Sequence, residues 1–170
     1  TDIQLEVQGH PWSLHFVNTG VPHVVHLLDH QAALEAVDLG RWGSALRYHQ
    51  RFQPAGTNVN FAVVRDAHRM AVRTYERGVE GETLACGTGA IASALIAAVK
   101  DQVASPVHVE TRSAEALTIF FDKQTGDGAV RFTLDANTSP GQRTGAISVA
   151  GQSYAVTQSG IRPPRARLHS

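Results

Sequence analysis

The stretch Tyr75-Glu-Arg-Gly-Val-Glu-Gly-Glu-Thr-Leu-Ala-Cys-Gly-Thr-Gly-Ala-Ile-Ala92 decides how the rest of the chain is expected to fold. It contains Cys86, the only cysteine among 170 residues, where a polar, glycine-spaced loop becomes an apolar helical run over residues 90–100. The start of a helix offers unpaired backbone N–H groups and the positive end of the helix dipole. Such groups hold anions and lower the pKa of a nearby thiol. The stretch therefore predicts a thiolate-and-anion site, with Glu76, Arg77 and Glu82 close to it in sequence.

The sequence around this stretch predicts many short strands and few helices. A short helix is expected from Asp38, as its cap, to Tyr48, and another begins within Asp29–Leu34. Alternating or short apolar runs predict strands at residues 3–7, 12–16, 24–28, 59–65, 70–75, 107–111, 117–121, 130–134, 146–149 and 154–157. The class is α+β: a mostly antiparallel, barrel-like lobe of sheet wrapped around one central helix.

Composition limits the classes of function. A chain of 170 residues suffices for one sizeable domain, and its 15 Lys+Arg and 15 Asp+Glu cancel, which argues against a nucleic-acid or membrane-surface partner. No apolar run reaches the ~18 residues of a membrane span. No signal peptide is visible and a single cysteine cannot form an internal disulfide, so we expect a cytoplasmic protein. The start at Thr1 fits a processed chain or part of a longer protein as well as a complete one.

Cys86 has two interpretations. A lone cysteine is more often an inert core residue than a reactive one. Here Gly87 and Gly89 flank it and would let a ligand approach the backbone closely. The polar Glu82-Thr83 pair precedes it, which is a poor neighbourhood for a purely apolar pocket. The position therefore favours a reactive thiol.

Two polar pairs leave their interpretation open. Glu76-Arg77 is either a solvated ion pair at a strand end, which contributes little, or part of a pocket. In a pocket, Arg77 would hold a carboxylate through two parallel hydrogen bonds and Glu76 would accept from an ammonium, which suits an amino-acid ligand. Asn58 and Asn60 are either turn residues or amides that bind a polar ligand.

The histidines and glycines argue against two other kinds of site. A strand places His23 and His26 on opposite faces, and no second cysteine or acidic cluster joins them and His30, so a zinc site is disfavoured. His23, behind Pro22, is better placed as a hydrogen-bonding or pKa-tuning neighbour. The Gly87-Thr-Gly89 pattern lacks a following Lys-Ser/Thr and is not a nucleotide-binding P-loop.

Three motifs together resemble those of the diaminopimelate epimerases: residues 75–90, Val17-Asn-Thr-Gly-Val-Pro-His23 and Gly56-Thr-Asn-Val-Asn-Phe61. The likeness runs from about Asp2 to Phe121 in the family's order and spacing. It implies a cofactor-independent (PLP-independent) isomerase without a metal, which interconverts the LL and meso forms of 2,6-diaminopimelate for lysine and peptidoglycan synthesis. Two cysteines, one on each face of the α-carbon, would act as thiolate base and thiol acid.

The resemblance also implies catalytic roles for individual residues. Cys86 matches the second of the two catalytic cysteines. Glu76 matches a residue placed to tune the thiols, and His23 matches the histidine with a similar tuning role. The mechanism agrees with the chemistry expected of the helix start, because a developing carbanion needs the electrostatic help that backbone N–H groups give to its carboxylate. A thiolate suits the base once its pKa lies near neutral pH.

Other residues match contacts to the substrate. Glu76 and Arg77 match the pair that binds the substrate's charged groups, and Asn58 matches an asparagine that contacts it. Gly87 and Thr88 match the backbone donors to its α-carboxylate. The small-molecule partner implied is therefore diaminopimelate.

The chain departs from the family pattern in three ways. The family's first cysteine lies in a Cys-Gly-Asn-Gly motif of an N-terminal lobe, and this motif is missing here. Val21 stands where many members have asparagine, which leaves one expected substrate contact open, although Gly-Val-Pro-His resembles a variant of the family motif. The family's Gly-Pro-Ala…Val-Phe ending is not recognisable. We therefore interpret residues 1–134 as a C-terminal lobe and residues 135–170 as divergent strands and a tail of unassigned role.

Three hypotheses follow. In the first, the chain supplies one of the two catalytic lobes of a diaminopimelate epimerase and is inactive alone, its partner being the missing N-terminal lobe. In the second, it is an orphan, non-catalytic lobe that binds an amino acid or anion. In the third, it belongs to a related PLP-independent racemase with another amino-acid substrate. A homodimer stays open as a source of the second acid.

Overall fold

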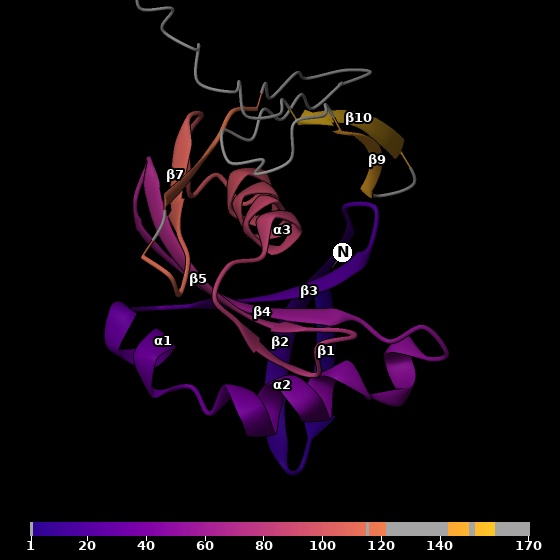
Figure 1. Ribbon diagram of the computed structural model, residues 1–170. Helices are drawn as coiled ribbons and strands as arrows, with labels where there is room; N and C mark the ends of the chain where they lie inside the picture. Colours follow the sequence, from indigo (N-terminus) through magenta and orange to yellow (C-terminus); the bar gives the residue numbers. More distant parts are fainter. Residues whose placement is uncertain (1, 115, 122–142, 150–151, 159–170) are drawn as a thin grey trace, which may run out of the picture.

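The structure is a computed structural model that describes residues 2–114, 116–121, 143–149 and 152–158 (Figure 1). The strand expected over residues 130–134 and the tail beyond residue 158 lie outside the described residues. Within them the elements follow in the order β1 (Asp2–Val7), β2 (His10–Asn18), β3 (Pro22–Leu28), α1 (Gln31–Ala36), α2 (Leu39–Arg47), η1 (Gln50–Phe52), β4 (Asn58–Asp66), β5 (Arg69–Glu76), β6 (Gly81–Thr83), α3 (Gly87–Val99), β7 (Val107–Glu110), β8 (Ala116–Ile119), β9 (Arg143–Val149) and β10 (Gln152–Gln158).

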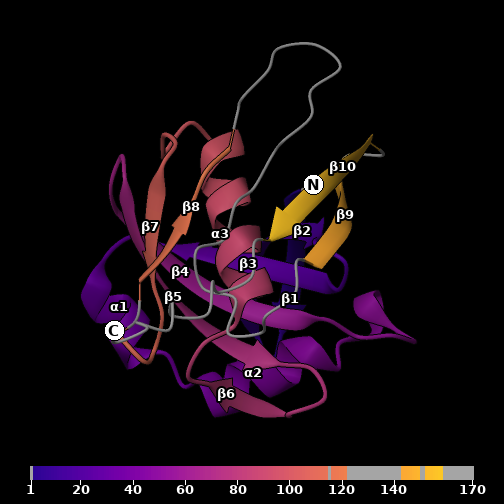
Figure 2. The same ribbon diagram turned by 45° about the horizontal axis from the view of Figure 1, so that its top comes forward.

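The strands form one mixed, mostly antiparallel sheet. Its order is β10-β9-β2-β3-β4-β5-β7-β8, with β1 paired to β2 and β6 paired to β5 off this path. Only the β3–β4 and β5–β7 pairs among these are parallel. The sheet curves, and both views show α3 on its inner side, with α1 and α2 on its outer side (Figures 1 and 2). The expected α+β lobe around one central helix is confirmed.

The helix α3 is apolar all round, and this explains its central place. Its residues from Gly89 to Ala98 are all buried. A helix without a polar face has to be covered on every side, and here β2, β3, β4, β5, β7 and β8 all contact it. Small alanine side chains let the strands approach closely. The inner core is completed by inward-facing strand residues such as Val25, Ala62 and Met70.

The outer face of the sheet carries a second apolar core beneath α1 and α2. Alternate residues of β2, β3 and β4 point outward and are buried there with Leu39 and Leu46 of α2. Asp38 caps α2 as expected, because its carboxylate accepts from the Arg41 backbone N–H at 3.0 Å. Gly43 lets α2 lie directly on Tyr75, since a Cβ at this position would meet the Tyr75 side chain at 2.6–2.7 Å.

Candidate active site

Cys86 is the cap residue of α3, directly before the first helical turn. Its backbone is extended (φ −131°, ψ 101°), and its carbonyl accepts the first helical hydrogen bond, from Ala90 at 2.9 Å. The thiol Sγ lies 3.5 Å from the Thr88 hydroxyl and the residue is only 8% exposed. The predicted placement of the single cysteine at a helix start is therefore confirmed, although the helix begins at Gly87 and not near residue 90.

The predicted lowering of the thiol pKa is wrong. Burial raises the pKa of the Cys86 thiol, and the charge of Glu76 raises it further. The Thr88 hydroxyl and the backbone N–H groups of Gly89 and Thr88 act in the opposite direction, as the helix-start argument requires, but they do not outweigh the loss of water. In this structure Cys86 is consequently a protonated thiol at neutral pH.

The start of α3 lies on a layer of buried polar side chains from three strands. A Cβ at Gly89 would overlap the Asn60 Oδ1 and lie 2.9 Å from the Thr74 hydroxyl and 3.3 Å from the Cys86 Sγ. Gly89 is thus required for protein packing, whereas the sequence had suggested space for a ligand. The sequence alone does not point to Thr74, and it allows two interpretations of Asn60. No local sequence pattern predicts that Asn60 and Thr74 lie at the start of α3, because only the order of the strands in the sheet brings them there.

His23 belongs to the same layer. It is 0% exposed, and its Nδ1 lies 3.1 Å from the Asn60 Nδ2. Burial lowers the pKa of His23 to about 4, and the positive charge of Arg77 acts in the same direction. His23 is therefore neutral at physiological pH. Its Nε2 is buried without a hydrogen-bond partner among the described residues.

Asn58 joins the end of β5 to the start of β3. Its Oδ1 accepts from the Arg77 backbone N–H at 2.7 Å, and its Nδ2 donates to the Pro22 carbonyl at 3.2 Å. The Arg77 guanidinium donates to the Ala55 carbonyl at 3.0 Å, which leaves further N–H groups of the side chain for an anion. The structure thus brings Asn58, Arg77 and His23 to one end of the sheet.

The acidic residues of the signature stretch separate into two groups. Glu76 is half-buried and lies close enough to Cys86 for its charge to raise the pKa of the thiol. Glu82 lies instead in β6, where it forms a two-point ion pair with Arg73 at 2.7 and 2.8 Å. Arg73 in turn donates to the Leu34 and Val37 carbonyls. Glu82 therefore links β6 and β5 to α1 and is not a neighbour of the thiol.

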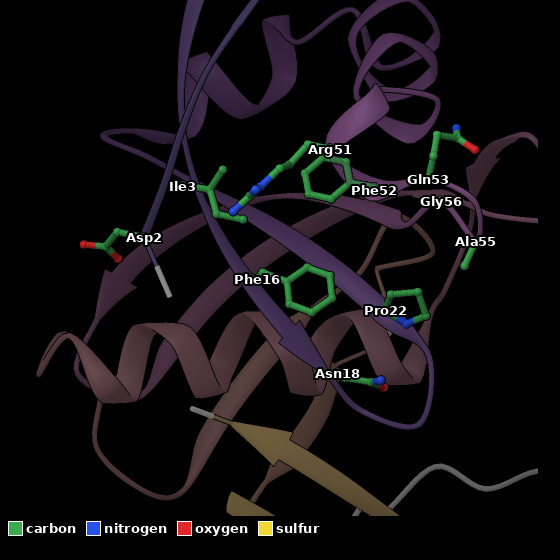
Figure 3. A pocket seen from close by; sticks show the side chains of 10 residues that line it. All are labelled: Asp2, Ile3, Phe16, Asn18, Pro22, Arg51, Phe52, Gln53, Ala55 and Gly56. Atoms are coloured by element: carbon green, nitrogen blue, oxygen red, sulfur yellow. The ribbon is translucent and has the colours of Figure 1, made fainter. Parts of the chain in front are cut away.

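A separate pocket of about 530 Å³ lies beside two of the motifs (Figure 3). Ile3, Phe16 and Phe52 surround it, and Asn18, Pro22 and the Ala55-Gly56 turn also line it. None of its lining residues is Cys86, Glu76 or Arg77. We place the candidate site at the start of α3, because the thiol, the helix N–H groups and the buried histidine meet there and not at this pocket.

Two further findings concern other classes of site. Within the described ranges, no three His, Cys, Asp or Glu residues are grouped so that they could hold a metal ion. No helix in the part of the chain that the structure describes is long and apolar enough to cross a membrane. The arrangement around Cys86 can donate one proton from sulfur, hold a carboxylate on backbone N–H groups and offer a guanidinium to a second anion.

The comparison with known families concerns the same part of the chain. The model of the diaminopimelate epimerase family matches residues 15–138, which include all the residues just described around Cys86. The chain belongs to the diaminopimelate epimerase family. It is 51% identical over 109 residues to the diaminopimelate epimerase of Aquifex aeolicus, a match that covers 64% of this chain and 38% of that protein. The Chlorobaculum tepidum diaminopimelate epimerase is 38% identical over 124 residues, with 72% and 47% covered.

This family member spans less than half the length of the curated relatives that it matches. Among solved structures, a phenazine biosynthesis protein PhzF family member from Enterococcus faecalis is similar with a TM-score of 0.46 and 14% identity, over 72% of this chain and 56% of that one. The boundary expected at residue 134 and the roles expected for Cys86, Glu76, Arg77 and Asn58 stay predictions.

Proposed function

We propose that this chain supplies one of the two acid/base thiols of a diaminopimelate epimerase and that Cys86 is this thiol. The proposal is supported above all by the position of Cys86: it is the cap residue of the central helix, inside the region matched to the family. The relatives that carry the name diaminopimelate epimerase support the substrate and the reaction. No cofactor is required, because two thiols suffice to exchange the proton.

The protonation state of Cys86 assigns it a starting role. Because burial raises the pKa of its thiol, Cys86 begins as the acid. A thiolate on the opposite face of the α-carbon removes the α-proton, so that the Cα–H bond breaks, an S–H bond forms and the electron pair remains on the α-carbon and its carboxylate. Cys86 then gives its proton to the other face: its S–H bond breaks and a new Cα–H bond forms. The configuration is inverted and Cys86 is left as thiolate.

The start of α3 stabilises both charged species of this sequence. The N–H groups of Gly87 and Thr88 would hold the substrate carboxylate, where negative charge grows as the proton leaves. The Thr88 hydroxyl and the N–H of Gly89 lower the pKa of Cys86 and so stabilise its thiolate for the reverse reaction. The negative charge of Glu76 acts against that thiolate, so it favours the protonated form of Cys86.

The remaining matched residues would bind the two charged groups of an amino acid. Arg77 offers its unused N–H groups to a carboxylate, and Glu76 accepts from an ammonium. Asn58 holds the Arg77 backbone by its Oδ1 and so fixes where the guanidinium begins. These contacts read groups that many amino acids share, so they leave the choice of substrate to residues outside this set.

A second candidate function follows from the same cysteine. Inversion needs an acid and a base on opposite faces, and the sequence holds one cysteine. A chain that meets no second thiol would bind an amino acid at the start of α3 without inverting it. The first alternative is therefore an orphan lobe that binds without catalysing. The second alternative is an enzyme of the same kind, a racemase that acts on another amino acid.

A chimera separates these functions. The part of the A. aeolicus enzyme that this chain does not match is joined to this chain, and conversion of LL- to meso-diaminopimelate is measured for the chimera and for the chain alone. We expect conversion by the chimera and none by the chain. A folded chimera that binds diaminopimelate without converting it would favour the orphan lobe. Conversion of another amino acid, with diaminopimelate unchanged, would favour the related racemase.

A further inference from the structure

The polar layer beneath the start of α3 forms a connected set of hydrogen bonds. His23, Asn60 and Thr74 come from β3, β4 and β5, and each is at most 3% exposed. The Thr74 hydroxyl donates to the Asn60 Oδ1 at 2.9 Å. The Asn60 Nδ2 lies 2.9 Å from the Val24 carbonyl oxygen and 3.1 Å from the His23 Nδ1. Three strands are thus joined by one asparagine.

The orientation of the Asn60 amide follows from its partners. A carbonyl oxygen only accepts, so the atom of Asn60 that faces the Val24 carbonyl has to be the amide nitrogen. The Thr74 hydroxyl donates to the opposite end of the amide. The reversed amide would set two acceptors against each other at Val24, so the hydrogen-bond partners exclude it.

This orientation fixes the proton of His23. The Asn60 Nδ2 has two hydrogens, and one is donated to Val24 and the other to the His23 Nδ1. The Nδ1 therefore has to present its lone pair, and the proton of the neutral ring lies on Nε2. That Nε2–H is buried and has no partner among the described residues. A buried donor without a partner is costly, so an acceptor placed at this Nε2–H would stabilise it.

We propose that Asn60, held by Thr74, is a positioning residue that keeps His23 as the neutral Nε2–H tautomer. His23 then serves the thiol site as a hydrogen-bond donor and not as a proton acceptor. The Nε2–H suits an anionic acceptor, such as a substrate carboxylate or the thiolate of the acid/base pair. The link to the thiol chemistry rests on the proposed function, whereas the tautomer follows from the hydrogen bonds alone.

The packing of Gly89 explains why Asn60 holds this orientation. The first turn of α3 lies on Asn60 and Thr74 so closely that even a Cβ at Gly89 would overlap the Asn60 Oδ1. The side chain of Asn60 is thus confined between the helix and the sheet, as well as bonded at both ends. Confinement and hydrogen bonds together hold the amide in this orientation.

The tautomer is measured directly by NMR on the chain as it exists. Long-range ¹H–¹⁵N correlation spectra of the uniformly ¹⁵N-labelled chain at pH 7 distinguish Nε2–H, Nδ1–H and imidazolium rings, and His23→Gln assigns the signals of His23. We expect the Nε2–H pattern for His23. An Nδ1–H or imidazolium pattern in the unaltered chain would overturn the proposal, and the measurement needs no enzymatic activity.

Variants test the part played by Asn60. In Asn60→Asp an acceptor faces the Nδ1 of His23, so the proton should move to Nδ1 and the midpoint of the His23 titration should rise by at least about one pH unit. An unchanged Nε2–H pattern in a folded Asn60→Asp chain would contradict the positioning role. Structural damage alone could lower activity, but it would not move the proton of His23 from Nε2 to Nδ1.

A second pair of variants tests Thr74. Thr74→Val keeps the shape of the side chain and removes one of the two hydrogen bonds that orient the Asn60 amide. Only the Val24 carbonyl then disfavours the reversed amide, so a minor second signal of His23, with the Nδ1–H pattern, should appear. Thr118→Val is the matched control, because Thr118 in β8 is also a threonine whose hydroxyl lies 3.0 Å from a histidine nitrogen, the Nδ1 of His108 in β7. It should leave the His23 signal unchanged. A single Nε2–H signal in Thr74→Val would show that Thr74 does not hold Asn60.

Discussion

The buried, neutral His23 makes a quantitative prediction about stability and pH. Its folded-state pKa is about 4, against an ordinary value of 6.5 in the unfolded chain. Between these values the unfolded chain binds more protons than the folded one, so the stability contributed by neutral His23 is present above pH 6.5 and is lost as the pH falls through about 4. With about 1.4 kcal/mol for each pH unit of the difference, the expected loss is about 3 kcal/mol.

The perturbation that isolates this effect is His23→Gln, since other groups also titrate in the range. Urea unfolding followed by tryptophan fluorescence would give the free energy of unfolding at pH 7, 5.5 and 4 for both chains. The unaltered chain should lose about 3 kcal/mol more than His23→Gln over this range. The exposed His108→Gln is the control and should follow the unaltered chain. Equal losses for the unaltered chain and His23→Gln would refute the argument that His23 is buried in the neutral form.

Three further predictions concern the surroundings of the thiol. Gly89→Ala should destabilise the fold by roughly 1–2 kcal/mol, because overpacking against Asn60 outweighs the gain in helix propensity. Gly40→Ala should stabilise the fold by up to about 1 kcal/mol, because the added Cβ would meet only the Asp38 Oδ1 at 3.6 Å. The urea midpoints of both variants test this, and equal shifts would contradict it. Glu82→Gln should lower the free energy of unfolding by roughly 1–2 kcal/mol, because it leaves the largely buried Arg73 charge without its carboxylate. Glu110→Gln breaks the more exposed pair with Arg65 and should lower it by less than about 1 kcal/mol. A larger loss in Glu110→Gln than in Glu82→Gln would contradict the role of burial. Because the pKa of Cys86 is raised above its ordinary value of 9.0, alkylation by iodoacetamide should reach half its maximal rate above pH 9, and a midpoint near neutral pH would show a lowered pKa instead.

The elements that could be predicted from the sequence are those with a clear local pattern of residues. The helix α3 could be predicted because an apolar run without a polar face has to be buried, and α2 because Asp38 is a good cap. The sequence pattern predicts the start of α3 too late, near residue 90, since Gly87 and Gly89 are poor helix formers. The strand β6 was missed because Gly81–Thr83 is short and polar and is defined only by its pairing with β5.

The site was predictable in position but not in its electrostatics. The glycine-spaced turn before an apolar run is enough to place Cys86 at a helix start. The sign of its pKa depends on burial by the sheet, which the local sequence does not contain. Asn60 is 37 residues from His23 and 14 from Thr74, so only the strand order brings the three together. Glu82 shows that closeness in sequence does not imply contact: it lies four residues before Cys86, but its partner in space is Arg73.

The central claim is that Cys86 transfers the proton, and Cys86→Ala in the chimera with the A. aeolicus enzyme tests it most directly. The measurement is the rate of LL-to-meso conversion of diaminopimelate at saturating substrate. Removal of a general acid typically costs about 10²–10⁴-fold, so Cys86→Ala should lower kcat by at least about 100-fold while the chimera stays folded. A chimera that keeps a near-normal kcat without Cys86 would contradict the claim.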